Sequence, residues 1–319
     1  MMRPAASGGR IGGGGGSADR PAGRHLLVDL RPLQEPDRSP VTADYLEALL
    51  GAYAADPLPG ESLTAILQLG LPDPTETLPA LAGLPVVARR SLPPTRLLRS
   101  GALTTDPFLL RGASLAPRLE AGPGGAAGGR TAPALFHTAS GSVPIASRLP
   151  VVVTLLDLAP WELPEAFGRS VAARFGHRLR ARILRDAAAV IVPSEAAALG
   201  ARRLLRIRSA RLRIVPLAVR EGVRPPEPAG PAATAAAALE LPARYLVHPG
   251  RFDARSDLAG LLGALARLAG AGRPGTLASA VPWPPRIVVV DASPEDRAEI
   301  ARAAVGLGVG ELLSYVPHL

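Results

Sequence analysis

The sequence predicts an α/β fold with two Rossmann-like domains, the second of them incomplete. Three observations lead to this prediction. Short apolar runs alternate with segments of helical periodicity, the pattern of a parallel sheet with crossover helices. This alternation occurs twice, on either side of a Pro- and Ala-rich stretch. The second occurrence supplies only about three strands, fewer than the five or six of a doubly wound sheet.

Composition shifts along the chain set the expected domain boundaries. Residues 1–24 contain a Gly tract and no apolar core like that of a signal peptide, so we expect a disordered leader. An N-terminal Rossmann-like domain is expected over residues 25–222. The Pro- and Ala-rich residues 223–240 form the predicted linker, and residues 241–319 form the partial C-terminal domain.

The elements of the first domain follow from its apolar runs. Residues 25–31 predict a short buried strand, and residues 43–53 have helical spacing. The run over residues 151–157 is unbroken in its apolarity, which favours a central strand covered on both faces. Further strands are expected at 63–69, 84–89, 134–137, 187–192 and 213–219, a helix at 195–205, and a Gly-rich loop at 122–129.

A basic helix is expected from about Pro164 to Asp186. Phe167, Val171, Phe175, Leu179 and Ile183 recur at i, i+4 steps, and six arginines surround this stripe. Two interpretations stay open. In the first the stripe packs on the sheet and the arginines are solvated. In the second the helix lies on an anionic lipid surface.

The second domain repeats the alternation in a shorter form. Strands are expected at 245–248, 286–290 and 311–316, and helices at 258–269 and 294–307.

Composition excludes several classes of protein. The 319 residues are 47% apolar and carry no Cys, which excludes a disordered chain, a thiolate nucleophile and a Cys-based metal site. The five His residues lack metal-ligand spacing, and no apolar run reaches the ~18 residues of a membrane span. We therefore expect a cytoplasmic protein without a metal or cofactor, with peripheral membrane contact left open.

The net charge of +9 comes from arginines alone, because the chain has no Lys. Codon usage in a GC-rich genome and recognition of phosphate or anionic lipid both explain this. Aromatic residues make up 3%, too few for the stacking platforms of proteins that bind single-stranded nucleic acid. We expect no nucleic-acid partner.

An ordered set of motifs resembles a known family. The set comprises Val151–Pro160, Ala189–Glu195, Arg213–Val219 and Tyr245–Leu258, flanked by His25–Arg31 and Arg286–Val316. In order and spacing it resembles the family-4 retaining glycosyltransferases of the GT-B fold, of the glycosyl transferases group 1 type, over residues 25–319. The resemblance implies that the N-terminal domain, residues 25–222, lies on the acceptor side.

The resemblance implies transfer of a sugar from a nucleotide-diphosphate donor to a hydroxyl of a glycan or lipid-linked acceptor, with retention and without a metal. In the family an Arg and a Lys after the first strand of the second domain neutralise the donor phosphates. Arg251 stands at the Arg position, directly after Gly250, whose missing side chain would permit close approach of the donor. Ser256 stands at the Lys position, and Arg255 is the candidate substitute.

Two residues are candidates for catalysis, although the sequence does not define the catalytic residue. His137 follows a predicted strand where family members often have a His facing the cleft, and Asp157 ends the central apolar run. The alternatives are a hydrogen-bonded structural His and an Asp that braces a loop. Trp161 lies just past the central run, where it lines an acceptor site or packs at the rim.

The chain also departs from the family pattern. Leu156 replaces a His near the sugar, Asp291 replaces a strand-end Gly, and residues 38–42 lack the glycines of the first loop. A Glu-x7-Glu stretch and a helix returning to the first domain do not occur before Leu319, so the chain looks C-terminally truncated.

Three function hypotheses result. The first is a glycosyltransferase or a fragment of one. The second is a catalytically degraded homologue that acts as a binding or partner subunit. The third, an unrelated dinucleotide-binding enzyme such as a dehydrogenase, is disfavoured because no Gly-x-Gly-x-x-Gly turn follows either first strand.

Overall fold

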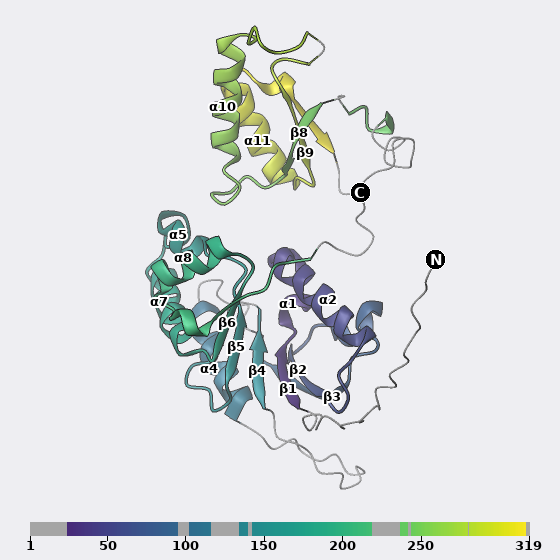
Figure 1. The fold of residues 1–319 in the computed structure, drawn as a ribbon, viewed down its shortest axis with the longest axis vertical. Helices are drawn as coiled ribbons and strands as arrows, with labels where there is room; N and C mark the ends of the chain where they lie inside the picture. Colours follow the sequence, from purple (N-terminus) through teal and green to yellow (C-terminus); the bar gives the residue numbers. More distant parts are fainter. Residues whose placement is uncertain are drawn as a thin grey trace, which may run out of the picture. The chain divides into compact units, whose positions relative to one another are not determined.

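The computed structural model describes residues 24–94, 102–115, 134–139, 142–218, 237–241, 244–279 and 281–316. These residues form two units, each with its own parallel sheet (Figure 1). The first unit comprises the described residues up to Leu158 and Ser170–Leu217. The second comprises Ala159–Arg169 and the described residues from Ala218 onward. The predicted α/β fold with two Rossmann-like domains is confirmed.

Several sequence predictions fall outside the described residues. The leader predicted over residues 1–24 lies outside them except for Arg24, and the Gly-rich loop at 122–129 lies outside them entirely. Of the predicted linker at 223–240, only residues 237–240 are described. These three expectations stay predictions.

The sheet of the first unit has seven parallel strands in the order β3-β2-β1-β4-β5-β6-β7. The chain order reverses between β1 and β4, which are neighbours in space. In an open parallel sheet, ligands bind beyond the carboxyl ends of the strands at such a switch point. The strands are β1 (His25–Asp29), β2 (Ser62–Gln68), β3 (Val86–Leu92), β4 (Leu135–Thr138), β5 (Val151–Thr154), β6 (Ala189–Val192) and β7 (Leu212–Ile214).

Helices cover this sheet. In Figure 1 α1 and α2 flank β1 and β2, whereas α7 and α8 flank β5 and β6. Leu46 and Leu50 of α2 belong to one apolar core with Val28 of β1 and Leu63 of β2. The helices are α1 (Arg31–Gln34), α2 (Pro40–Ala55), α3 (Pro74–Thr77), α4 (Ala102–Leu115), α7 (Val171–Asp186) and α8 (Glu195–Leu205).

Helix α4 was not predicted from the sequence. It contains Pro107, which removes a backbone donor and normally ends a helix, so the local pattern resembles a loop. The structure nevertheless packs α4 beside α7 and buries Leu110 completely. Tertiary packing therefore overrides the local signal here.

The single helix predicted from Pro164 to Asp186 is wrong. The segment forms α6 (Pro164–Phe167) and α7, with a break at Gly168, and a further short helix, α5 (Ala159–Glu162), precedes it. Ser170 has an extended backbone and begins a new helix, α7. Its hydroxyl accepts a hydrogen bond from the backbone N–H of Ala173, at 3.1 Å, and so caps that helix.

The predicted packing of the stripe on the sheet is wrong for the first half of α7. Val171 and Phe175 are 73% and 58% exposed. The buried residues of the helix are Gly176, Ala181, Ile183 and Leu184. Ile183 is the last member of the stripe, which meets the core only at that end because i, i+4 steps drift by about 40° each around a helix. Val171 and Phe175 thus remain on the outward face, among the arginines.

The second unit has a three-stranded parallel sheet in the order β10-β9-β8, which confirms the predicted number of strands. Ile287 and Val289 of the central strand share a core with Leu262 of α10 and Ile300 of α11. The elements are β8 (Tyr245–Pro249), α10 (Leu258–Ala271), β9 (Arg286–Val290), α11 (Pro294–Gly306) and β10 (Leu313–Val316).

Strand β8 is exposed on both faces. Tyr245, Leu246 and Val247 are 37%, 47% and 63% exposed, although parallel strands are normally covered on both sides. The order β10-β9-β8 matches β3-β2-β1 of the first unit, where β4 pairs with the other edge of β1. Among the described residues β8 has no such neighbour, and its second edge is unpaired.

Candidate functional site

The carboxyl end of β1 carries a buried group of charges. Asp29 is fully buried, and its two carboxylate oxygens accept hydrogen bonds from Nε and Nη2 of Arg31 at 2.8 and 2.9 Å. Nη1 of Arg31 lies 3.3 Å from Oδ2 of Asp106 on α4. The hydroxyl of Ser142 donates to the same Asp106 oxygen at 2.9 Å. Two carboxylates therefore share one guanidinium.

Ion pairing decides the charge state of this group. Burial opposes the charged form of Arg31, but the charges and hydrogen bonds of Asp29 and Asp106 outweigh burial and raise the pKa of Arg31 above its usual value. The second oxygen of Asp106, Oδ1, is buried and has no hydrogen-bond partner among the described residues. The group as a whole carries one net negative charge, which suits ligands that donate hydrogen bonds better than it suits phosphate.

The sequence analysis missed this group. The spacing Asp-x-Arg, which begins at the last residue of a buried strand, was a usable signal, because strand carboxyl ends carry the sites of open parallel sheets. Asp106 could not be found in this way, since it lies on α4, which has no clear sequence pattern.

His137 lies inside β4, next to two hydroxyl groups. Its Nε2 is 3.1 Å from the hydroxyl of Thr154, the last residue of β5, and that hydroxyl is 3.2 Å from the phenol oxygen of Tyr45 on α2. Burial of the imidazole lowers the pKa of His137 to about 4, and the negative charge of Asp29 only partly opposes this. The ring is therefore neutral near pH 7.

Asp157 lies three residues beyond the end of β5. It is partly buried, as is the neighbouring Leu156, and both belong to the first unit with His137. The two catalytic candidates are thus near the carboxyl ends of adjacent strands, β4 and β5, at the edge of the sheet where its ligands are expected.

In the second unit, Gly250 directly follows β8. A Cβ atom built on Gly250 would lie 2.5 Å from Cα and 2.6 Å from Cβ of Ala292, so no side chain fits. The chain's own backbone thus requires this glycine, independently of any ligand. Arg251 comes next, and its side chain is exposed and makes no ion pair with the described residues.

The other two phosphate-site candidates lie in the same loop, which leads into α10. Oδ1 of Asp253 accepts hydrogen bonds from the backbone N–H groups of Arg255 and Ser256, both at 2.9 Å, and from the Ser256 hydroxyl at 3.1 Å. Asp257 caps α10 through the N–H of Gly260. The structure therefore gathers Gly250, Arg251, Arg255 and Ser256 in one loop, together with two carboxylates.

Two further details concern the predicted cations and departures. The guanidinium of Arg255 lies 4.8 Å from the ring centroid of Phe167, which belongs to the same unit, so this cation is engaged with an aromatic ring. Asp291 has φ of +58°, a left-handed conformation that favours glycine. This backbone explains why a glycine would suit that position.

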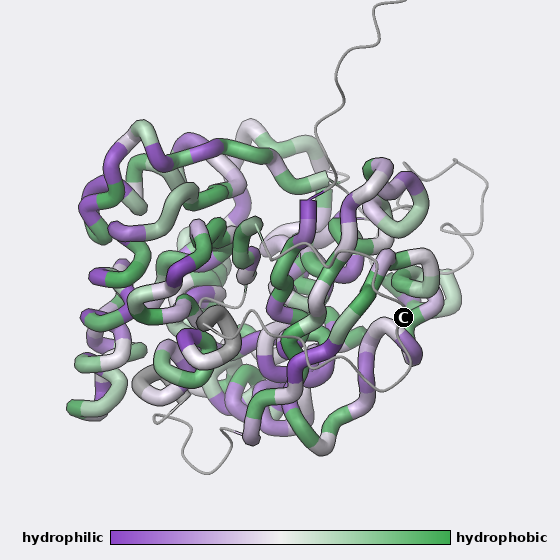
Figure 2. Tube along the Cα trace, turned by 90° about the horizontal axis from the view of Figure 1, so that it is seen from below, coloured by the Kyte–Doolittle hydropathy of each residue, from purple (hydrophilic) through white to green (hydrophobic). Residues whose placement is uncertain are grey.

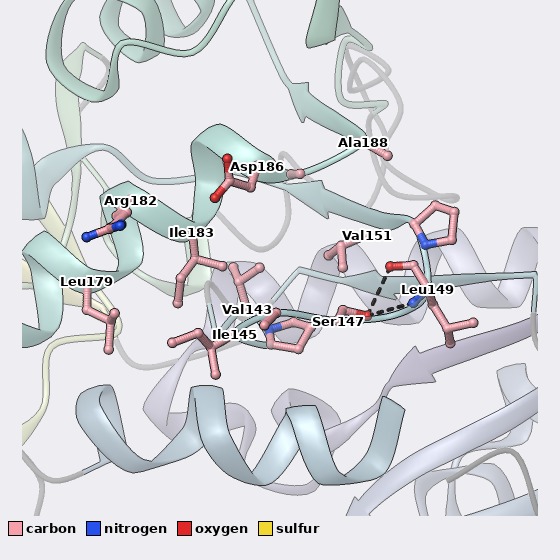
Figure 3. Close-up of a pocket in the computed structure, with 14 residues that line it drawn as sticks. Val143, Ile145, Ser147, Leu149, Val151, Leu179, Arg182, Ile183, Asp186 and Ala188 are labelled. Atoms are coloured by element: carbon pink, nitrogen blue, oxygen red, sulfur yellow. Dashed lines mark hydrogen bonds between the residues drawn. The ribbon is translucent and has the colours of Figure 1, made fainter. Parts of the chain in front are cut away.

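A cavity of about 410 Å³ lies elsewhere in the first unit (Figure 3). It is bounded by the second half of α7, the loop before β5 and the starts of β5 and β6, at the amino edge of the sheet. Leu179 and Ile183 face Val143 and Ile145 across it. None of the predicted site residues lines this cavity, so it is separate from the candidate site.

Neither a metal nor a membrane span is indicated in the described part of the chain. No group of three or more His, Cys, Asp or Glu residues there could hold a metal ion. None of the helices described is both long enough and apolar enough to cross a bilayer. In Figure 2 hydrophobic and hydrophilic segments alternate along the helical parts of the tube.

Comparisons with known proteins give a result at the level of the fold. No protein-family model matches the sequence, and no curated protein matches it either. Solved structures do match. HepE of Anabaena, in complex with UDP and glucose, has a TM-score of 0.55 at 14% identity; the match covers 93% of this chain and 70% of HepE.

Two further structures give the same picture. Sucrose-phosphate synthase of Thermosynechococcus elongatus has a TM-score of 0.56 at 18% identity, with 93% of this chain and 71% of that chain covered. WaaG, a glycosyltransferase involved in lipopolysaccharide biosynthesis, has a TM-score of 0.53 at 11% identity, with 92% and 70% covered. The chain therefore has the GT-B glycosyltransferase fold, with a second sheet of three strands.

Proposed function

We propose that this chain is a nucleotide-sugar-dependent retaining glycosyltransferase, or a part of one, of the group 1 type. One observation carries the proposal. Arg251, which is exposed and makes no ion pair within the described part of the chain, follows the first strand of the second unit in a fold shared with a protein solved in complex with UDP and glucose. The motif order in the sequence supports the same assignment.

The chemistry requires a cation at that position. The acceptor oxygen forms a bond to the anomeric carbon while the bond from that carbon to the diphosphate oxygen breaks. The acceptor's proton passes to the leaving diphosphate, which gains negative charge as the bond breaks. A preorganised guanidinium such as that of Arg251 stabilises this charge. Arg255 and the Ser256 hydroxyl are the further candidates in the loop.

Calorimetric titration with UDP, and with UDP-glucose as donor probe, tests the proposal. A charge-assisted hydrogen bond is worth about 1.5–3 kcal/mol, so Arg251→Gln should weaken binding by roughly 10- to 100-fold. Arg302→Gln, an exposed arginine on α11 of the same unit, serves as the control and should leave binding unchanged. Absence of UDP binding to the wild-type chain, or equal affinity of Arg251→Gln and wild type, would refute the proposal.

A second candidate function is a degraded homologue that binds without turnover. Asp253 occupies the backbone N–H groups of Arg255 and Ser256 and the Ser256 hydroxyl, and its charge opposes a diphosphate. Incubation with radiolabelled UDP-glucose distinguishes the two functions. Release of UDP or transfer of label supports the enzyme. Binding with neither supports the partner subunit.

For the acceptor we propose a lipid-linked molecule reached at an anionic membrane surface. The exposed Val171 and Phe175 on α7, with Arg174 and Arg178 beside them, support this. Co-sedimentation with vesicles should be stronger for phosphatidylglycerol-containing than for pure phosphatidylcholine vesicles, and Phe175→Ser should weaken it. Val87→Ser, on edge strand β3, is the control and should change nothing. Equal sedimentation with both kinds of vesicle would contradict the proposal.

A further inference from the structure

Three side chains from three different elements form a hydrogen-bonded row at the switch point of the first sheet. Tyr45 comes from α2, Thr154 from β5 and His137 from β4. The Thr154 hydroxyl stands in the middle, 3.2 Å from the Tyr45 phenol and 3.1 Å from Nε2 of His137. Thr154 is 1% exposed, so water does not replace either partner.

Val28 of β1 is the register partner of His137 in β4, so both side chains lie on the same face of the sheet. The core that includes Val28 also includes residues of α2, the helix that carries Tyr45. Helix packing thus brings the phenol to the end of the row.

The number of available protons indicates which group donates in each hydrogen bond of this row. A buried hydroxyl has one proton and must donate it, because a buried donor without an acceptor is destabilising. Thr154 therefore donates either to His137 or to Tyr45. A phenol is a stronger donor and a weaker acceptor than an aliphatic hydroxyl, which favours donation from Tyr45 to Thr154 and from Thr154 to Nε2 of His137. Nε2 is then the acceptor, and the ring proton is on Nδ1.

We propose that Thr154, itself held by Tyr45, is a positioning residue that keeps His137 as the neutral Nδ1–H tautomer, so that Nδ1–H donates a hydrogen bond to an oxygen of the bound sugar or acceptor. The described residues provide Nδ1 with no partner, and the imidazole is partly exposed, so this donor is left for a ligand. The role of the ligand oxygen rests on the proposed function; the tautomer does not.

The row also explains why the ring stays neutral. A protonated His137 would donate from Nε2 to Thr154, and Thr154 would have to turn and donate to Tyr45. Protonation therefore requires both reversal of the row and burial of a charge, in agreement with the lowered pKa of His137. Neutral imidazole with a fixed donor suits a hydroxyl or carbonyl oxygen, whereas imidazolium would suit phosphate.

Long-range ¹H–¹⁵N correlation spectra of the uniformly labelled chain without ligand test the tautomer, because protonated and unprotonated ring nitrogens have well-separated shifts. His137→Asn assigns the signals. We expect Nδ1 protonated and Nε2 unprotonated at pH 7. In Thr154→Val the ring should revert to the Nε2–H form that free histidine prefers, and Thr154→Ser should restore the wild-type tautomer.

Tyr45→Phe supplies a second, milder variant. Without the phenol, Nε2 of His137 is the only acceptor left in this row for the Thr154 proton, so the Nδ1–H form should persist. A rise of the Nε2–H population in Tyr45→Phe would contradict the direction assigned to the row. Circular dichroism confirms that each variant is folded. A wild-type ring protonated on Nε2, or an unchanged tautomer in folded Thr154→Val, would overturn the proposal.

The second part of the proposal, donation from Nδ1–H of His137 to a ligand oxygen, is tested by adding UDP-glucose to the same sample. A shift of the Nδ1 proton resonance on binding supports donation to a ligand oxygen. Binding that leaves this resonance unchanged overturns that part, while absence of UDP-glucose binding refutes the proposed function and leaves the tautomer result intact.

Discussion

Replacing Arg31 with Met should destabilise the first unit more than any surface substitution. The Met side chain keeps much of the apolar stem but removes the guanidinium shared by Asp29 and Asp106. Side-chain exposure is 10% for Arg31 and for Asp106 and 0% for Asp29, so water cannot replace the lost charge. Breaking a buried ion pair by removing one partner costs about 3–5 kcal/mol.

The surface pair of Arg38 and Glu35 provides the matched control. Nη1 of Arg38 lies 3.1 Å from Oε2 of Glu35, and the Arg38 side chain is 49% exposed. Exposed pairs contribute about 0–1 kcal/mol, so Arg38→Met should have little effect. Both variants remove one positive charge from the same unit, and burial is the main difference between them.

Urea unfolding followed by far-UV circular dichroism measures the free energy of unfolding, and hydrogen exchange of β1 and β4 amides assigns the change to the first unit. The deficit of Arg31→Met should shrink on acidification. An unpaired buried carboxylate has a raised folded-state pKa, so its protonation restores stability as the pH falls. A loss below about 1 kcal/mol at pH 7, equal to that of Arg38→Met, would refute the assignment of Arg31 as the buried partner of two carboxylates.

Three further predictions concern other parts of the molecule. Gly250→Ala should destabilise the second unit by about 1–3 kcal/mol in thermal unfolding because the new methyl group overlaps Ala292, whereas Gly270→Ala on α10, with nothing within 4 Å, should be neutral or stabilising. Because the pKa of His137 falls from 6.5 to about 4 on folding, the unfolded state binds the extra proton between these values. Stability should therefore rise with pH over this window, by about 2–3 kcal/mol, and His137→Asn should flatten the rise. One edge of β8 has no paired strand among the residues that the structure describes, and this edge should promote self-association, so Val247→Lys should reduce the oligomer fraction in analytical ultracentrifugation. A wild-type chain that is monomeric and unfolds in one sharp transition would contradict this.

Much of the second unit could be predicted from sequence because its signals are local. Leu258, which follows the capping Asp257, begins α10 in the structure as in the prediction, and the apolar run of Arg286–Val290 matches β9. Gly250 was singled out from the sequence because a missing side chain would permit close approach of a donor, whereas the structure gives a different reason for the glycine, the contact with the chain's own backbone. The partner in that close approach is Ala292, from 42 residues further along, and local reasoning does not reach it.

Elements without a local pattern needed the tertiary structure. Helix α4 contains Pro107 and was missed, and with it Asp106, the second carboxylate beside Arg31. The stripe on α7 had the correct period, yet Val171 and Phe175 are exposed, because periodicity gives the angle between residues and not which side meets the sheet.

The sequence by itself determined the alternation of strands and helices, the two parallel sheets and the residues of the loop after β8. These follow from hydrophobic period, capping residues and glycine sterics, which act within a few residues. Only the tertiary structure decided which polar groups meet at the switch point. Asp29 with Asp106, and His137 with Tyr45, come from distant segments whose pairing depends on strand order and helix packing. Burial then sets their charge, because desolvation depends on the surrounding protein and not on neighbouring residues in the chain.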